Sequence, residues 1–574
     1  MPKNVPIENI RHSLSHLMSM AIMEKYPKTG LGVGPAIENG FYQDYDLPGI
    51  ISEKDFGWME KRIRELIAQK IKFVKSESDF ASALKFYEHD PYKTEMINDL
   101  KTAGEKNLSF YDSDWFHNLC LGPHVKDTSE INPEAFKLDK IAGAYWRGSE
   151  KNKMLTRIYG LAFTTKKELT DYLELLKEAE KRDHKKIGKE MGLFSFHDEA
   201  PGFPFWHNKG MVLREALMRP YNEMIKKAGY KIVSTPILLP EDLWRQSGHW
   251  DNYKDQMYFT EIEKKNFAIK PMNCPGTIII YKNCPRSYRE LPLRLAEFGE
   301  IHRHEPSGTL NGLFRTRAFR QDDSHIFLRE DQTEREVKDI IKLTLKFYKI
   351  IGFKEINIEL STRPKKSIGT DEMWNKAENV LKKILNGLKL KFKINEGDGA
   401  FYGPKIDFHI KDCLGRSWQC ATIQLDFSMP ERFGLEYIDE DGLPKRPVMI
   451  HRTVLGSIQR FVGILIEHFG GAFPFWLSPE QIWVIPITDK HIKYAKKVGE
   501  ELASAGLRVE IKEENQTVGK KIREGELQKI PYLLIVGDKE MKTKSVAVRQ
   551  KGKGDIGMIK LSKFLERVKI EKDV

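Results

Sequence analysis

Short apolar runs alternate with longer amphipathic segments along the C-terminal part of the chain. They occupy residues 482–487, 494–505, 507–511, 519–528, 532–536, 545–549 and 561–568. Apolar runs of strand length that alternate with segments of helical period are typical of α/β domains. The pattern therefore predicts a small α/β domain over residues 478–574.

A second pattern, over residues 166–193, has the period of an amphipathic helix. Leu173, Leu175, Leu176 and Ala179 occupy one side of it among many charged residues. We interpret this segment as a linker helix. It would separate an N-terminal unit of mixed helix and strand, residues 1–165, from a central unit, residues 194–477.

In the central unit, basic and apolar residues alternate over residues 313–320, which favours a strand with a guanidinium-bearing face. Residues 305–312 before it have the composition of a long hairpin turn. Arginines gather here, at positions 303, 315, 317 and 320, beside Glu305, Gln321, Asp322, Asp323 and His325. Because guanidinium binds phosphate oxygens in a bidentate fork, we interpret the region as a polyphosphate clamp. The alternative is a solvated salt-bridge face of an antiparallel sheet.

Composition narrows the class of protein. Of 574 residues, 40% are hydrophobic and 31% are charged, as in a soluble protein with substantial cores. No apolar run reaches the roughly 18 residues of a membrane span, and residues 1–8 have no apolar signal core. We therefore expect a cytoplasmic protein with no membrane partner.

The net charge is +12, and residues 478–574 contribute half of it, with 21 Lys+Arg against 15 Asp+Glu. This excess fits a polyanionic partner. The five cysteines are too few and too scattered for a disulfide framework, so thiol or metal chemistry is the better interpretation.

Two sets of histidines and cysteines are candidates for such chemistry. His12 and His16 lie at helical i,i+4 spacing, and Cys120 and His124 repeat that spacing. These four residues could form a zinc site or be structural histidines. Three others, Cys274, His325 and His451, lie so far apart that their spacing indicates nothing. Taken alone, Cys274 is best interpreted as a small buried hydrophobic residue, and each histidine as a hydrogen-bonded core or surface residue.

Four segments carry a family resemblance. Residues 297–328 resemble motif 2 of the class II aminoacyl-tRNA synthetases, residues 228–238 resemble motif 1, and residues 448–460 resemble motif 3. Residues 270–276, KPMNCPG, resemble a segment particular to threonyl-tRNA synthetases, and nearly the whole chain is similar to that family. The resemblance implies a multidomain α+β protein. Its parts would be an α/β editing domain, an antiparallel-sheet catalytic domain and a C-terminal α/β anticodon-binding domain.

The resemblance implies threonine–tRNA ligase activity, with ATP, L-threonine and tRNA(Thr) as partners, Mg²⁺ with ATP, and a homodimer formed through motif 1. One Zn²⁺ per subunit would be held by Cys274, His325 and His451. Residues implied for the activation step are Arg303, Arg315, Arg460, Gln321 and Lys405, with Glu305 and Phe319 at ATP. Residues implied for threonine are Asp323, Gln424, Tyr402, Met272 and Ser457. For Lys405 the alternative is a tight turn between strands. Where the class often has an acid before the motif 3 arginine, this chain has Gln459.

The resemblance also implies a hydrolytic editing pocket for seryl-tRNA without a metal. Its residues would be His12, His16, Lys93, Asn118, Cys120 and His124. Asn118 stands where the family commonly has an aspartate. Asn515, Glu540 and Arg549 match positions that contact the anticodon. The family usually carries a small β-grasp module before the editing domain, and we expect this chain to lack it.

Two other functions remain as alternatives. One is a class II synthetase for another amino acid, such as serine or proline, against which the Cys274, His325 and His451 set argues. The other is a degenerate synthetase that binds tRNA or tRNA-like RNA without catalysis, against which Arg303, Arg315 and Arg460 argue.

Overall fold

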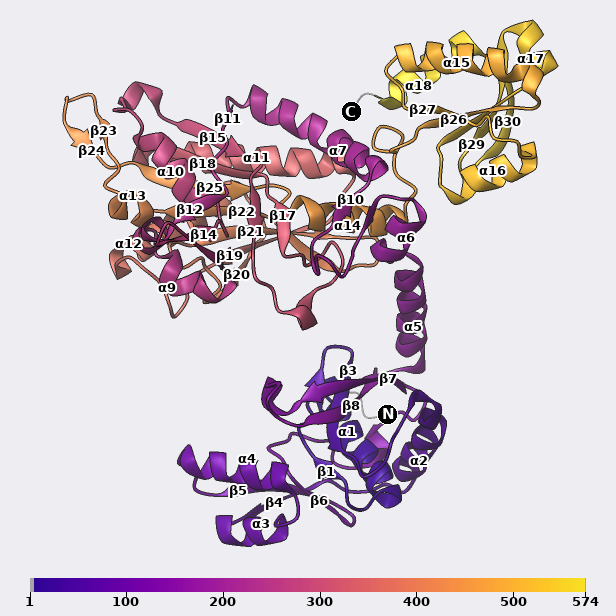
Figure 1. The fold of residues 1–574 in the computed structure, drawn as a ribbon. Helices are drawn as coiled ribbons and strands as arrows, with labels where there is room; N and C mark the ends of the chain where they lie inside the picture. Colours follow the sequence, from indigo (N-terminus) through magenta and orange to yellow (C-terminus); the bar gives the residue numbers. More distant parts are fainter. Residues whose placement is uncertain (1–4, 573–574) are drawn as a thin grey trace. The chain divides into compact units, whose positions relative to one another are not determined.

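The computed structural model describes residues 5–572 and contains two compact units that divide after Lys177 (Figure 1). Helix α5 (Lys166–Lys181) spans the division, and α6 (His184–Glu190) follows it. The single helix predicted over residues 166–193 is therefore wrong. The chain breaks at Asp183, whose carboxylate accepts a hydrogen bond from the Lys185 amide at 2.8 Å and so begins a new helix.

The first unit contains two antiparallel sheets. One has the strand order β1-β3-β8-β7, with β2 beside β3, and the other has the order β4-β5-β6. The strands of the larger sheet are β1 (Gly30–Leu31), β2 (Ala36–Ile37), β3 (Gly40–Asp46), β7 (Phe136–Tyr145) and β8 (Met154–Ala162). Those of the smaller sheet are β4 (Val74–Ser78), β5 (Leu108–Ser113) and β6 (Phe116–Leu119).

Helix α1 (Ile7–Lys25) forms the centre of the first unit. Leu14, Leu17 and Met18 are almost completely buried in a core shared with α2 (Phe56–Ala68) and with β3 and β8. His16 lies on the same helix and is also buried. The helix is buried continuously over residues 13–22, so His16 enters the interior as part of packing, while His12 is half-buried.

The second unit is built on an eight-stranded sheet with the order β11-β15-β18-β25-β22-β21-β19-β20. Its strands are β11 (Lys231–Ile232), β15 (Leu293–Glu297), β18 (Asp323–Leu328), β19 (Ile356–Ser361), β20 (Lys393–Asn395), β21 (Lys405–Lys411), β22 (Ser417–Asp426) and β25 (Val448–Thr453). All neighbours pair antiparallel except at the two edges, where β11 and β20 pair parallel. The predicted antiparallel catalytic sheet is confirmed.

The two faces of this sheet have different coverings. Ile326 and Ile450 point into a core with helices α7 (Asn208–Lys227), α11 (Thr333–Ile351), α12 (Asp371–Gly387) and α14 (Ile458–Phe469). Phe327 and Met449, one residue along, belong to a separate core with α10 (Cys274–Lys282) and α13 (Ser428–Arg432). Because side chains alternate along strands, His325 and His451 share this second face.

The strand predicted over residues 313–320 is mostly wrong. Only β17 (Ala318–Arg320) is extended, and it pairs antiparallel with β16 (Glu300–His302). The segment between them is therefore a hairpin loop longer than residues 305–312. Residues 313–317 are held by irregular hydrogen bonds, such as Arg317 N to Gly202 O at 2.8 Å, so the alternation there does not come from a sheet.

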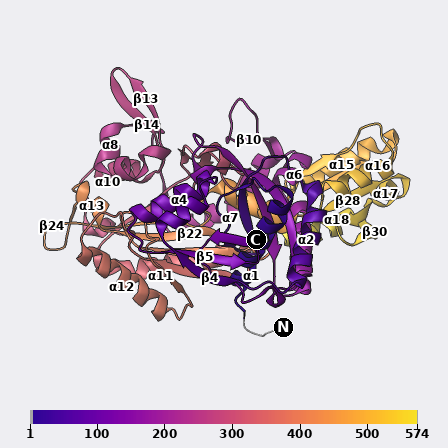
Figure 2. The same cartoon turned by 90° about the horizontal axis from the view of Figure 1, so that it is seen from below.

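A second hairpin, β13 (Tyr258–Ile262) and β14 (Lys265–Ile269), extends beyond α8 (Glu241–Gln246) and α10 in Figure 2. Its strand β14 also pairs with β12 (Leu238–Pro240). No helix among residues 5–572 is long and apolar enough to cross a membrane.

The C-terminal residues form a five-stranded mixed sheet with the order β27-β26-β28-β29-β30. Its elements are β26 (Ile482–Pro486), α15 (Ile492–Ser504), β27 (Val509–Ile511), α16 (Val518–Leu527), β28 (Tyr532–Val536), α17 (Asp538–Thr543), β29 (Ser545–Gln550), β30 (Gly554–Lys560) and α18 (Leu561–Lys572). The predicted α/β order is confirmed. Two elements were missed, α17, which is a short polar helix, and β30, which is rich in glycine.

Candidate functional site

Four candidate residues form a row across the second face of the large sheet. The pairing registers place Lys405 opposite Gln424, Gln424 opposite His451, and His451 opposite His325. They come from β21, β22, β25 and β18, which are neighbours in the sheet, and only β21 and β22 are also consecutive in sequence. Directly opposed residues in a sheet have Cβ atoms about 5 Å apart, so the row brings the side chains together.

Cys274 completes a buried cluster with the two histidines. It begins helix α10, which covers this face, and the ligand atoms of Cys274, His325 and His451 all lie within 4.8 Å of one another. All three side chains are buried.

This donor set fits zinc. The buried Nδ1 of His325 has no hydrogen-bond partner in the described structure. His451 Nε2 lies 2.9 Å from a carboxylate oxygen of Asp426, the arrangement that orients metal-binding histidines, and its other nitrogen remains available. Two imidazoles and one thiolate are the ligands of a zinc with an open position.

Around this cluster lie the residues expected to bind threonine. Asp323 Oδ2 accepts a hydrogen bond from Asn273 Nδ2 at 3.1 Å. Gly299 lies against the same amide, since a Cβ built there would be 2.2 Å from Asn273 Oδ1. The Tyr402 ring stacks on His451 with centroids 4.6 Å apart, and its hydroxyl donates to the side-chain oxygen of Gln424.

One residue of this cluster was missed from the sequence. His249 is completely buried, and its Nε2 lies 3.0 Å from Met272 Sδ and 3.6 Å from Cys274 Sγ. Burial, with smaller effects from His451, Arg303 and Arg432, lowers the pKa of His249 to about 3, so the ring is neutral. A lone histidine in residues 248–250 carries no spacing signal, and only the fold reveals its place.

Three arginines gather beside this cluster. Burial lowers the pKa of Arg460; Cys420 and Glu305 act against this effect, and the positive charges of Arg315 and Arg303 add to it. Arg315 is paired with Glu305 at 2.8 Å. The Arg303 guanidinium lies 5.3 Å from the Phe319 ring centroid. Glu305 balances only one of the three charges, since neither Arg303 nor Arg460 is paired with a carboxylate in the described structure, and the remaining positive charge is suited to a polyanion.

Two further contacts join motif 2 to motif 3. Gln321 forms an isolated backbone bridge with Ser457, whose hydroxyl accepts the Arg460 amide at 3.2 Å and caps α14. The side-chain oxygen of Gln459 accepts the Arg320 amide at 2.9 Å. An acid in place of Gln459 would offer the same acceptor, so this contact does not require a charge.

Lys405 stands at the start of β21, directly after a turn closed by an Ala400–Gly403 bridge. Its ammonium lies 2.9 Å from Asp407 and 3.0 Å from Asp398. Burial would lower the pKa of Lys405, but these carboxylates outweigh it and raise the pKa. The residue is therefore a paired cation at the end of the row.

A second cluster lies in the first unit. The ligand atoms of His12, His16, Cys120 and His124 also lie within 4.8 Å of one another. Cys120 Sγ lies 3.3 Å from both His12 Nε2 and His124 Nε2. Burial is the main cause that lowers the pKa of each histidine, of His124 to about 2, so the imidazoles are neutral.

Asn118 and Lys93 complete this pocket. The Asn118 amide lies 3.0 Å from His16 Nε2, while Asn118 Oδ1 and His16 Nδ1 are buried without partners in the described structure. Burial lowers the pKa of Lys93 to about 8, against the opposing effects of Asp90 and Cys120. All six residues expected in an editing pocket thus belong to the first unit.

The three residues expected at the anticodon lie on separate elements of the C-terminal part. Asn515 is exposed between β27 and α16. Glu540, in α17, accepts the Gly537 amide at 2.9 Å, and Arg549, in β29, is paired with Glu526 at 3.1 Å. No feature of their surroundings marks them as a common site.

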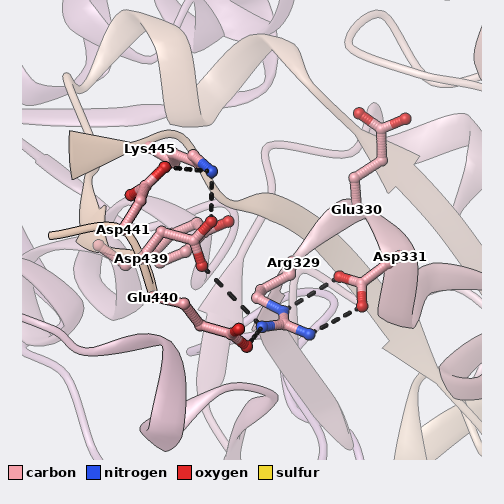
Figure 3. A pocket seen from close by; sticks show the side chains of 8 residues that line it. Arg329, Glu330, Asp331, Asp439, Glu440, Asp441 and Lys445 are labelled. Atoms are coloured by element: carbon pink, nitrogen blue, oxygen red, sulfur yellow. Dashed lines mark hydrogen bonds and ion pairs between the residues drawn. The ribbon is translucent and has the colours of Figure 1, made fainter. Parts of the chain in front are cut away.

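A third polar hollow lies beside the hairpin of β23 (Tyr437–Ile438) and β24 (Pro444–Lys445). Here Arg329 is paired with Asp331 and Glu440, and Lys445 with Asp439 and Asp441 (Figure 3). Exposed ion pairs of this kind are common on protein surfaces, so we assign no ligand to this hollow.

Comparison with known proteins agrees with this geometry. Residues 258–469 match the class II core domain of tRNA synthetases (G, H, P, S and T), and residues 481–571 match an anticodon binding domain. Residues 108–159 match the second additional domain of threonyl and alanyl tRNA synthetases.

Individual relatives cover almost the entire chain. The threonine–tRNA ligase of Clostridium acetobutylicum is 52% identical over 98% of this chain and 88% of its own length. That of Carboxydothermus hydrogenoformans is 53% identical over the same shares. A solved structure described as the RNA binding domain of threonyl-tRNA synthetase from Cryptosporidium parvum is 41% identical, with a TM-score of 0.66 over 68% of this chain and 98% of its own. The chain belongs to the threonyl-tRNA synthetase family.

Proposed function

We propose that the chain is a threonine–tRNA ligase that activates threonine with ATP and transfers it to the 3′ end of tRNA(Thr). The observation that carries the proposal is the buried cluster of Cys274, His325 and His451 beside three arginines. An amino-acid pocket next to a polyphosphate site is what adenylate formation requires.

Cys274, His325 and His451 would hold one zinc, which supplies an open coordination position for the amino group and hydroxyl of threonine. An apolar pocket distinguishes threonine from valine only about 100-fold, because the two are nearly isosteric. A zinc ion that must be coordinated by a side-chain hydroxyl would exclude valine far more strongly than that, because valine has no hydroxyl. Asp323, positioned by Asn273, would accept a hydrogen bond from the substrate amino group, and Tyr402 and Gln424 would close the pocket around the side chain.

In the activation step the threonine carboxylate attacks the α-phosphate of ATP, and pyrophosphate leaves. Neither this activation nor the later transfer to tRNA needs a protein nucleophile, so the protein would contribute alignment of the substrates and neutralisation of their charge. Arg303 would bind the α-phosphate, and Arg315 and Arg460 the outer phosphates together with Mg²⁺. Phe319 would stack on adenine, and Glu305, which now pairs with Arg315, would help to position the nucleotide. Four further residues would line the substrate site and hold its other side chains in place through the contacts described above: Gln321, Lys405, Met272 and Ser457.

The cluster of His12, His16, Cys120 and His124 would hydrolyse seryl-tRNA(Thr). Serine keeps the hydroxyl and lacks one methyl, a difference that a pocket reads only about 10–200-fold, so a second pocket is needed. We propose that this pocket works without a metal. His16 Nε2 is already paired with Asn118, and His124 Nδ1 lies 3.1 Å from the Ser13 hydroxyl.

The basic C-terminal domain would read the anticodon through Asn515, Glu540 and Arg549. Helix α7 and edge strand β11 would form the interface of a homodimer, for which the exposed Ile232 and Ile237 supply apolar surface. The reaction is expected to take place in the cytoplasm. Sedimentation and salt-dependent tRNA binding test these assignments.

The first experiment is amino-acid-dependent ATP–pyrophosphate exchange with threonine, serine and valine, in zinc-replete and zinc-stripped protein. We expect strong exchange with threonine, weaker exchange with serine, none with valine, and loss of exchange on stripping. Folded, tRNA-binding protein that exchanges with no amino acid would favour the degenerate binding protein instead.

A further inference from the structure

His184 lies at the point where the chain enters the second unit, and none of the synthetase motifs contains it. It is the first residue of α6, and its side chain is 1% exposed. The ring contacts three segments that are distant in sequence. These are Glu467 on α14, the Leu313 amide in the motif 2 loop, and the ring of Phe314 at a centroid distance of 4.1 Å.

The hydrogen bonds fix a single tautomer. The Leu313 N–H is an obligatory donor and points at Nε2 over 3.0 Å, so Nε2 must be the acceptor. Nδ1 therefore carries the proton and donates it to Glu467 Oε1 at 2.7 Å. The same carboxylate oxygen accepts the His184 amide at 3.1 Å, and Arg416 pairs with the other oxygen. Both ring nitrogens are thus in use, which leaves none for a metal.

The contacts continue into the proposed phosphate site. Phe314, next to Leu313, accepts a hydrogen bond on its carbonyl from Arg460 Nε at 3.0 Å. Gly312, on the other side, has a positive φ of 49°, and a Cβ there would be 2.2 Å from His184 Nε2. The loop therefore passes so close to the imidazole that only glycine fits.

We propose that His184 is a positioning residue for ATP. It holds the backbone of residues 312–314, which lie in the hairpin loop between β16 and β17. Through the Phe314 carbonyl it fixes the guanidinium of Arg460. Arg315 follows this segment directly, and its own side chain is held by Glu305. The inference rests on the proposed role of these arginines in binding ATP. Threonine, bound at Asp323 and the metal cluster, is not reached by these contacts.

Two conservative variants separate the two ends of the imidazole. In H184Q the side-chain oxygen can take the place of Nε2 and accept the Leu313 amide. In H184N the side-chain amide can take the place of Nδ1 and donate to Glu467, but no atom of the shorter side chain accepts the Leu313 N–H. The measurement is the KM for ATP and for threonine in pyrophosphate exchange, with the full chain and the thermal midpoint as the control for folding.

We expect H184N to raise the KM for ATP about tenfold, as for the loss of one hydrogen bond to the main chain, with the KM for threonine within about twofold of wild type. H184Q should stay within about threefold for both substrates. Equal effects of the two variants, or an equal rise in both KM values, would overturn the proposal. If the wild type exchanges with no amino acid, the proposed function itself fails, and this outcome is separate.

A measurement on the wild type needs no variant. Amide hydrogen exchange at Leu313 should be slow without ATP, while the amides of Ser307 and Gly308, exposed in the same loop, exchange fast. Fast exchange at Leu313 in the free protein would contradict a contact that is formed in advance of ATP binding.

Discussion

His325 and His451 are direct cross-strand partners on β18 and β25, with their rings perpendicular and 4.9 Å apart. Each strand alternates a histidine on the substrate face with an isoleucine in the helical core, Ile326 and Ile450. The two imidazoles are thus brought together by sheet register. Cys274 then needs only the first turn of α10 to reach them.

Replacing Cys274 by serine should remove zinc and reduce threonine-dependent exchange at least 100-fold, because a neutral hydroxyl is a poor zinc ligand and no longer anchors the substrate. Metal analysis of purified full-length protein, together with exchange assays, measures both effects. Cys284→Ser, at an exposed cysteine, is the matched control and should change neither. Cys120→Ser should also retain the zinc. A C274S protein with wild-type zinc content would rule out the assignment.

Gly299→Ala should weaken threonine binding. The added methyl would lie 2.2 Å from Asn273 Oδ1 and displace the amide that positions Asp323. We expect the KM for threonine to rise about tenfold, the effect of one lost hydrogen bond to a charged group. Gly387→Ala, where a methyl meets nothing within 4 Å, is the control in the same unit. An unchanged KM for threonine in G299A would show that Asn273 does not position Asp323.

Asn118→Asp tests the neutral editing pocket. The amide now donates to His16 Nε2, whereas a carboxylate can only accept, so His16 would have to carry a proton there. The negative charge would raise the pKa of His16, which burial now lowers. We expect seryl-tRNA(Thr) deacylation to increase about tenfold in N118D and to fall about tenfold in N118A. Equal deacylation rates in both variants would show that Asn118 takes no part in the hydrolytic step.

The pH dependence of deacylation should report on Lys93. Its pKa of about 8, lowered by burial, means that the amine is charged below pH 8 and neutral above it. If the cation polarises the ester carbonyl, deacylation falls as the pH rises through 8. Lys93→Arg keeps its charge to much higher pH, so its profile should lose this decline. A wild-type rate that increases through pH 8 would instead indicate a neutral amine acting as a base.

Much of the architecture could be predicted from apolar patterns, because buried strands such as Tyr532–Val536 are short continuous apolar runs bounded by proline and glycine. The predicted strand over residues 313–320 failed because its alternation comes from irregular contacts in a loop. The linker prediction failed at Asp183, where a capping carboxylate interrupts a continuous amphipathic pattern.

The cluster of Cys274, His325 and His451 could be predicted only through the family motifs, whereas spacing alone already marked His12, His16, Cys120 and His124. The row from Lys405 to His325 depends on strand order and register, and neither can be read from a single chain. His249 and His184 show the limit most clearly. Each is an isolated histidine in sequence, and each becomes meaningful only through partners more than 20 residues away, Met272 and Leu313 among them.

The placement of both histidines on directly paired strands also bears on the accuracy of translation. A shift of one residue in the pairing of β18 with β25 would turn one imidazole into the helical core and an isoleucine toward the substrate. A copy of the chain with such a folding error would lose the proposed zinc site, and with it both the proposed selection against valine and the proposed anchor for threonine. Misfolded copies of this enzyme should therefore be inactive, and they should not attach the wrong amino acid to tRNA. Folding errors of this kind would slow protein synthesis without placing wrong residues in the new proteins.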